Sequence, residues 1–180
     1  MKTKLRSAIE GNKVGLFFAA ALGFSGVSHG SSQGVAVERF ELKVVENTVG
    51  ANEIIAGEFA DALQQLRYKV SFDSEFFKRT NLCAAYVATG ELVVAKPHCR
   101  AALRTSRHEG LNYRPSKTTR VRQAVALNNL GVLYALAGEH QESQQFFESA
   151  GGKSSEMKVT SARNINILEQ RAGDDVASSY

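Results

Sequence analysis

Few side chains in this 180-residue chain could perform chemistry, and none of them forms a catalytic pattern. The four histidines are scattered, and no metal-ligand spacing, nucleophile elbow or glycine-rich phosphate loop occurs. Carboxylate pairs such as Glu139 and Glu142 fall on polar faces of expected helices, where a solvated surface is their usual role. The sequence therefore predicts a protein without enzymatic activity, and it indicates no cofactor and no metal site.

The two cysteines are the other reactive side chains. Cys83 lies seven residues before Gly90 and Cys99 lies nine residues after it, so antiparallel helices that turn at this glycine place the thiols opposite each other. A disulfide between them would close a loop of about 15 residues, which the chain-entropy estimate values at roughly 3 kcal/mol. The alternative is a pair of small buried thiols. Export to an oxidising compartment favours the disulfide.

The first thirty residues have the layout of a secretory signal peptide. Four basic residues precede a short apolar run over residues 14–24, and small residues follow as far as Gly30. Cleavage after Ser28 or Gly30 would leave a periplasmic or secreted protein. The apolar run is too short for a typical membrane span, so we expect no transmembrane segment in the mature chain. The alternative is an uncleaved N-terminus that anchors the protein in the inner membrane.

Removal of residues 1–30 changes the charge of the protein. The whole chain carries a net charge of +4, and the segment holds four bases and one acid, which leaves +1 for the mature protein. The excess of positive charge is therefore mainly a targeting signal, and nucleic acid is not expected as a partner.

One stretch of the mature chain is nevertheless strongly basic. Residues 100–122 carry seven basic side chains against one acid. We call this stretch the basic insertion, and its candidate binding residues are Arg104, Arg107, Arg114, Lys117, Arg120 and Arg122. Such a local excess of charge could bind an anionic component of the cell envelope. The alternative is a solvated loop with long basic side chains.

The elements that must position these residues recur along the chain. Four glycines, each followed by an acid, stand 33, 48 and 35 residues apart: Gly57, Gly90, Gly138 and Gly173. Nine residues before the last three stands an asparagine followed by an aliphatic residue: Asn81, Asn129 and Asn164. Recurrence over such distances is the signature of a repeat protein, in which each unit buries its apolar face against its neighbours.

The units resemble tetratricopeptide repeats, which are helical hairpins of about 34 residues. The best copy reads NLGVLY from Asn129, followed by Gly138-Glu139, Phe147 and Ala150. The preceding copy reads NLCAAY from Asn81 with the same spacing, and the outer copies are partial. The resemblance implies an all-α fold, a right-handed stack of helical hairpins that ends in a C-terminal capping helix.

The glycines and prolines that interrupt helices, together with the repeats, divide the chain into segments. We expect a signal peptide at 1–30, a loosely ordered segment at 31–41, a helical domain at 42–175 and a tail at 176–180. Within the domain we expect repeats at about 42–70, 74–106 and 117–151, with Gly151-Gly152 before a capping helix at 157–171. The first repeat should form two helices that meet near Gly57, and the helix containing Pro97 should continue through it. No alternating β pattern competes with the helical periodicity, so we expect no strand.

The resemblance also implies a function, because the first helices of such repeats line a concave groove that takes peptides or partner helices. The groove positions carried over to this chain are Phe77, Asn81, Ala84, Val87, Val125, Asn128, Asn129, Val132, Arg163, Asn164 and Ile167. An asparagine amide can donate to a carbonyl and accept from an N–H group, so the recurring asparagines could bind the backbone of an extended ligand. The alternative is that they tie adjacent helices together. We therefore expect a non-catalytic envelope scaffold that binds a protein or peptide, or alternatively an anionic component through the basic insertion.

Overall fold

The computed structural model describes residues 32–37, 40–68, 74–108 and 116–177. The expected signal peptide lies outside these ranges, as do Arg114 and the turn before residue 74. Within the described ranges, no helix combines the length and the apolar character that crossing a membrane requires.

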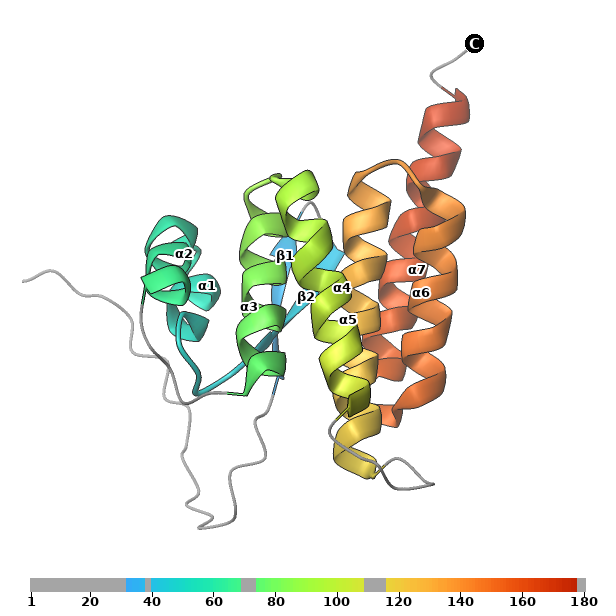
Figure 1. Cartoon of the computed structure of the whole chain (residues 1–180). Coiled ribbons are helices and arrows are strands. Elements are labelled where there is room, and N and C mark those ends of the chain that lie inside the picture. The colour runs from blue at the N-terminus through green and yellow to red at the C-terminus, as the bar shows by residue number, and fades with distance from the viewer. Residues whose placement is uncertain (1–31, 38–39, 69–73, 109–115, 178–180) are drawn as a thin grey trace, which may run out of the picture.

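The described chain is predominantly helical, as predicted. The helices are α1 (Ala51–Ala56), α2 (Phe59–Tyr68), α3 (Glu75–Ala88), α4 (Leu92–His108), α5 (Lys117–Leu136), α6 (His140–Lys153) and α7 (Ser155–Ala177). Helices α3 and α4 form one antiparallel hairpin and α5 and α6 form the next, and α7 packs beside α6 and α5 (Figure 1).

The expected turn glycines end three of the helical segments. Gly57, Gly90 and Gly138 have φ values of 82°, 78° and 77°, a left-handed conformation that costs glycine little. The side chain of Ser116 accepts a hydrogen bond from the Thr119 N–H at 3.0 Å and so caps the start of α5. Gly173 differs from the other three, because α7 continues past it to Ala177.

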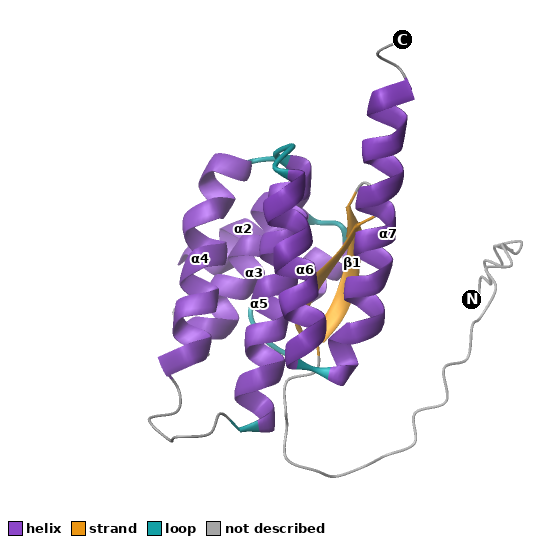
Figure 2. Cartoon of the chain, turned by 90° about the vertical axis from the view of Figure 1, so that its right-hand side faces the viewer, coloured by secondary structure: helices purple, strands orange, loops and turns teal. Residues whose placement is uncertain are grey.

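The N-terminal part of the domain contradicts the prediction of a loosely ordered segment followed directly by a helix. Strands β1 (Ser32–Val37) and β2 (Phe40–Val45) form an antiparallel hairpin, and the first helix begins only at Ala51. Figure 2 shows the two strands alongside α7. The physical reason is visible in β2, where Phe40, Leu42 and Val44 are fully buried and alternate with the half-buried Glu41 and Lys43.

Two further boundaries differ from those expected. Gly151 and Gly152 lie inside α6 instead of separating two helices, and α7 is longer than the expected segment 157–171 at both ends. Pro97 lies within α4, which continues through it as expected.

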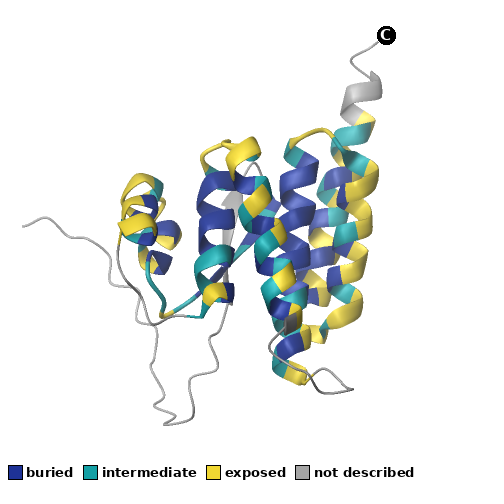
Figure 3. Ribbon diagram, viewed as in Figure 1, coloured by how far each residue is buried: buried dark blue, intermediate teal, exposed yellow. Residues whose placement is uncertain are grey.

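The helices form two layers, with α3, α5 and α7 next to β2 and with α4 and α6 behind them. The core lies between the β-hairpin and these helices, and Figure 3 shows its buried residues concentrated in α3 and α5. Phe40 of β2 stacks on Phe147 of α6 with ring centroids 6.2 Å apart. Gly131 makes room for Phe147, because a Cβ atom on this glycine would lie 2.5 Å from two ring carbons. The hairpin is therefore an integral part of the core.

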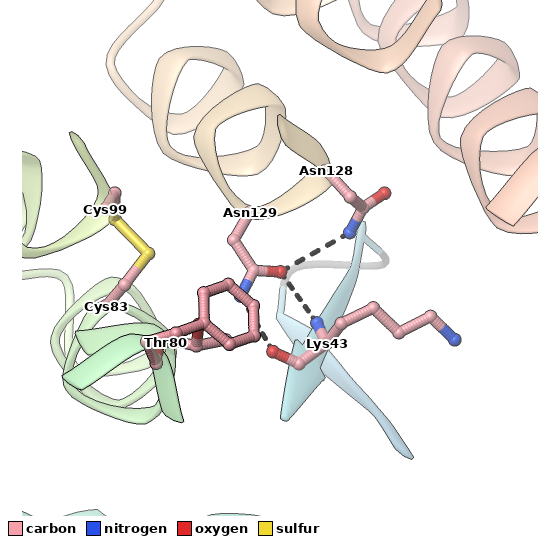
Figure 4. Close-up of a disulfide and its surroundings, with 7 residues drawn as sticks. Lys43, Thr80, Cys83, Cys99, Asn128 and Asn129 are labelled. Atoms are coloured by element: carbon pink, nitrogen blue, oxygen red, sulfur yellow. Dashed lines mark hydrogen bonds between the residues drawn. A yellow bond between two sulfur atoms is a disulfide. The ribbon is translucent and has the colours of Figure 1, made fainter. Parts of the chain in front are cut away.

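The predicted disulfide is confirmed. Cys83 of α3 and Cys99 of α4 are bonded, and their Cα atoms lie 4.8 Å apart (Figure 4). Both side chains are buried, so the bond ties the two helices of this hairpin together inside the core.

Candidate functional site

The recurring asparagines all face strand β2. Asn81 of α3, Asn129 of α5 and Asn164 of α7 are fully buried, and each binds the main chain of a different β2 residue. We call this row, together with Asn128, the asparagine ladder. Because successive residues of a strand turn their main-chain groups to opposite edges, the ladder contacts alternate residues of β2.

Each amide bonds both main-chain groups of one residue. Asn129 Oδ1 accepts from the Lys43 N–H at 2.8 Å, and Asn129 Nδ2 donates to the Lys43 carbonyl at 2.7 Å (Figure 4). Asn81 bonds Val45 in the same way, at 2.9 and 3.2 Å, and Asn164 bonds Glu41 at 2.9 and 3.1 Å. The helices thus supply the hydrogen bonds that a neighbouring strand would normally supply.

The asparagines also connect the helices to one another. Asn164 Nδ2 also donates to Asn128 Oδ1 at 3.1 Å, which links α7 to α5. Asn128 Nδ2 in turn donates to the Glu41 carbonyl at 2.8 Å. The amides therefore bind an extended backbone and tie helices together, and the extended backbone belongs to the chain itself.

The side chains of β2 add a charged anchor on the face opposite its apolar residues. The Glu41 carboxylate accepts from Arg163 Nη1 at 3.1 Å and lies within 3.4 Å of Thr160 Oγ1, both on α7. Lys43 Nζ is ion-paired with the same carboxylate. Strand β2 is therefore fixed to α7 by side-chain contacts as well as by its main chain.

The structure brings most of the predicted groove residues together beneath the hairpin. Ala84, Val87, Val125 and Val132 are buried with the asparagines, Phe77 and Ile167 are partly exposed, and Arg163 is exposed. Val87 and Val132 belong to the same core cluster as Phe40 and Leu42 of β2. The groove predicted for a partner is thus filled by this chain's own strand.

The basic side chains of the basic insertion differ in their exposure and in their contacts. Arg104, Arg107 and Arg120 are exposed, whereas Lys117 Nζ lies 3.3 Å from the Glu156 carboxylate. Arg122 is partly buried, with its guanidinium 4.9 Å from the centre of the Phe77 ring. Burial lowers the pKa of Arg122 from its ordinary value.

An arginine–tyrosine contact, absent from the sequence predictions, joins successive hairpins. Arg67 Nε of α2 donates to the Tyr86 hydroxyl of α3 at 2.9 Å, and Arg100 Nη2 of α4 donates to the Tyr134 hydroxyl of α5 at 2.8 Å. The signal was present, because each arginine stands ten residues after a turn glycine and each tyrosine four residues before the next. Glu148 and Glu169 occupy the corresponding positions between α6 and α7.

His98 of α4 lies against an aromatic ring and a cation of α3. Its ring stacks on Tyr86 with centroids 5.4 Å apart, and its Nδ1 lies 3.1 Å from Arg79 Nη1. Burial, followed by the positive charge of Arg79, lowers the pKa of His98 from its ordinary value. Among the described residues, no three His, Cys, Asp or Glu side chains are placed to hold a metal ion.

Comparison with known proteins gives no match to a family model, to a curated protein or to a solved structure.

Proposed function

We propose that this chain is a non-catalytic protein-interaction scaffold of the bacterial cell envelope, built as a tetratricopeptide-type stack that binds an extended segment of a partner protein. The observation that carries the proposal is that the asparagine ladder fixes β2 by both main-chain groups of Glu41, Lys43 and Val45, and so leaves the outer edge of β1 for a partner. A free strand edge offers backbone groups and can therefore pair with an extended chain of any sequence.

Helix α7 is assigned as the cap of this stack. The position that holds the small residues Cys83 and Gly131 in the two full repeats holds Asn166 in α7, where a further helix could not approach as closely. The tyrosine position holds Glu169, and both Asn166 and Glu169 are exposed. A polar outer face of this kind ends a stack in water.

The partner segment binds at the hairpin and does not replace it. Displacing β2 would expose Phe40, Leu42 and Val44, at a cost of roughly 1.5–3 kcal/mol each. It would also leave the buried asparagine amides without partners, which adds to that cost. Strand β2 therefore stays in place, and the partner must use the other strand of the hairpin.

The available edge is that of β1. In β2 the main-chain N–H and C=O groups of residues 41, 43 and 45 point to the asparagines. The main-chain groups of residues 40, 42 and 44 therefore point to β1, where they lie opposite Val37, Val35 and Gln33. The main-chain groups of Ser32, Gly34 and Ala36 consequently point to the outer edge. Within the described residues the sheet has two strands, so this edge can accept a third from a partner.

The test is a proline scan of β1 in the exported protein. Gly34→Pro removes an outward N–H and should abolish capture of an envelope protein while leaving the melting temperature nearly unchanged. Val35→Pro removes an N–H that bonds β2 and should destabilise the fold. This result would verify that the main-chain groups of Val35 face β2 and that those of Gly34 face outward. Capture should also survive high salt, since backbone pairing is only weakly screened. Partner capture that is equal in Gly34→Pro and the parent protein, or that collapses with salt, would exclude this binding mode.

A further inference from the structure

The charged residues of helices α3 to α7 are divided between the two ends of the helical array. Neighbouring helices run in opposite directions, so one end collects the starts of α3, α5 and α7 and the finishes of α4 and α6 (Figure 1, lower end). We call this the basic end, and it comprises the five residues of each of these helices that lie nearest to it. Its exposed cations are Arg104, Arg107, Lys117, Arg120, Lys153 and Lys158.

Within the described residues, the basic end carries two acids, and both are paired. Glu75 bonds Arg79 at 2.6 Å, and Glu156 lies 3.3 Å from Lys117. The other five exposed cations have no carboxylate within ion-pair distance in the described part of the chain. Four of the helices, α4 to α7, contribute to this excess of charge.

The opposite end has the opposite sign. Among the described residues, Lys96 is the basic side chain there, and it lies 3.6 Å from the Glu139 carboxylate. The other acids at that end are Glu142 in the first turn of α6 and Glu91 immediately before α4. The mature chain has almost no net charge, so any electrostatic attraction that it exerts must come from this separation of charge and must be oriented.

We propose that the basic end binds the surface of an anionic phospholipid bilayer and stands the helical array upright on it. The cations come from both helical layers, α4 and α6 as well as α5 and α7, so they cover an area and do not follow a line. An area of separate long side chains fits a plane of headgroups better than it fits one small anion or a linear polymer. The negative charge of the bilayer surface repels the opposite, acidic end of the array and so directs that end away from the membrane.

An aromatic side chain at this end supports a membrane surface over a purely ionic partner. Phe77 lies in the first turn of α3 and is only partly buried, and the Arg122 guanidinium lies 4.9 Å from the centre of its ring. A ring paired with a cation is suited to the boundary between headgroups and acyl chains. The β1 edge does not depend on any of these residues, so this inference goes beyond the proposed function and can fail independently of it.

The experiment measures co-sedimentation of the exported protein with vesicles, using two triple variants of equal net charge. Arg104→Gln, Arg107→Gln and Arg120→Gln remove three cations from the basic end. Gln64→Glu, Gln145→Glu and Gln170→Glu add three acids at exposed positions elsewhere. The parent should bind phosphatidylcholine vesicles containing about one third phosphatidylglycerol and should ignore pure phosphatidylcholine.

The arginine variant should bind the anionic vesicles at least about tenfold more weakly than the parent, and the glutamine variant should stay within about twofold. Salt of about 1 M should release the parent protein, because the Debye length then falls to ~3 Å. Equal weakening of both variants would show that net charge alone matters and would overturn the proposal. Failure of the parent to bind anionic vesicles would also overturn it, as would binding to soluble polyphosphate or an acidic protein without binding to vesicles.

Discussion

The strongest single perturbation of this fold should be removal of the central ladder amide, Asn129. Asn129→Ala deletes the acceptor of the Lys43 N–H and the donor to the Lys43 carbonyl, at 2.8 and 2.7 Å. The asparagine is fully buried, and Lys43 is only partly exposed, so water can replace these bonds poorly. At about 1–3 kcal/mol for each unsatisfied group, the variant should lose roughly 2–6 kcal/mol of unfolding free energy.

The assay is urea unfolding followed by circular dichroism, with two companion variants. Asn129→Leu keeps the volume of the side chain and should lose a similar amount, which separates lost hydrogen bonds from lost packing. Asn166→Ala removes an exposed asparagine from α7 and should change stability by less than about 0.5 kcal/mol. An Asn129→Ala protein that unfolds within about 0.5 kcal/mol of the parent would refute the assignment of these bonds as structural supports of β2.

Three further predictions concern other parts of the fold. Replacing Cys83 and Cys99 together by alanine opens a loop between residues 16 apart, so urea unfolding should show a loss of about 3 kcal/mol, and no loss would contradict the chain-entropy argument. Gly131→Ala places a methyl group 2.5 Å from Phe147 and should cost about 1–3 kcal/mol, whereas Gly152→Ala meets no atom within 4 Å and should be neutral or stabilising in thermal melts. Because the pKa of His98 is lowered on folding, the unfolded chain binds its proton more readily, and stability should fall as the pH drops below about 6.5. Melting temperatures of the parent protein and of His98→Gln across that range test this, and an unchanged pH dependence in the variant would exclude His98 as its source.

The helical part of this fold could be predicted because its signals are local and repeated. The glycines at 57, 90 and 138 set the turns, and the constant distance from Asn81 and Asn129 to the following glycine set the register of the helices. The same register placed Cys83 opposite Cys99. Each of these inferences needed only the spacing of residues within one hairpin.

The sequence analysis did not predict the β-hairpin of β1 and β2, for two physical reasons. The first is length, since the alternation of Phe40, Leu42 and Val44 with Glu41 and Lys43 spans too few residues to stand out, although the signal was present. The second is that the pairing partner of β2 on one edge is a row of side chains 36 to 123 residues distant. No local pattern reports such a partner. The backbone-binding role of the asparagines was therefore anticipated as a possibility, but the identity of the bound strand was not.

The proposed binding mode requires that the helices hold β2 by its backbone and leave the outer edge of β1 for a partner. Residue-resolved amide hydrogen exchange of the purified protein, alone and with its captured partner, tests this directly. In the free protein the amides of Glu41, Lys43 and Val45 should exchange slowly, and those of Gly34 and Ala36 should exchange rapidly. Binding of the partner should slow amide exchange at Gly34 and Ala36 and should leave the amides of Glu41, Lys43 and Val45 unchanged. Fast exchange at Lys43 in the free protein, or bound-state protection that leaves Gly34 and Ala36 unchanged, would contradict the account.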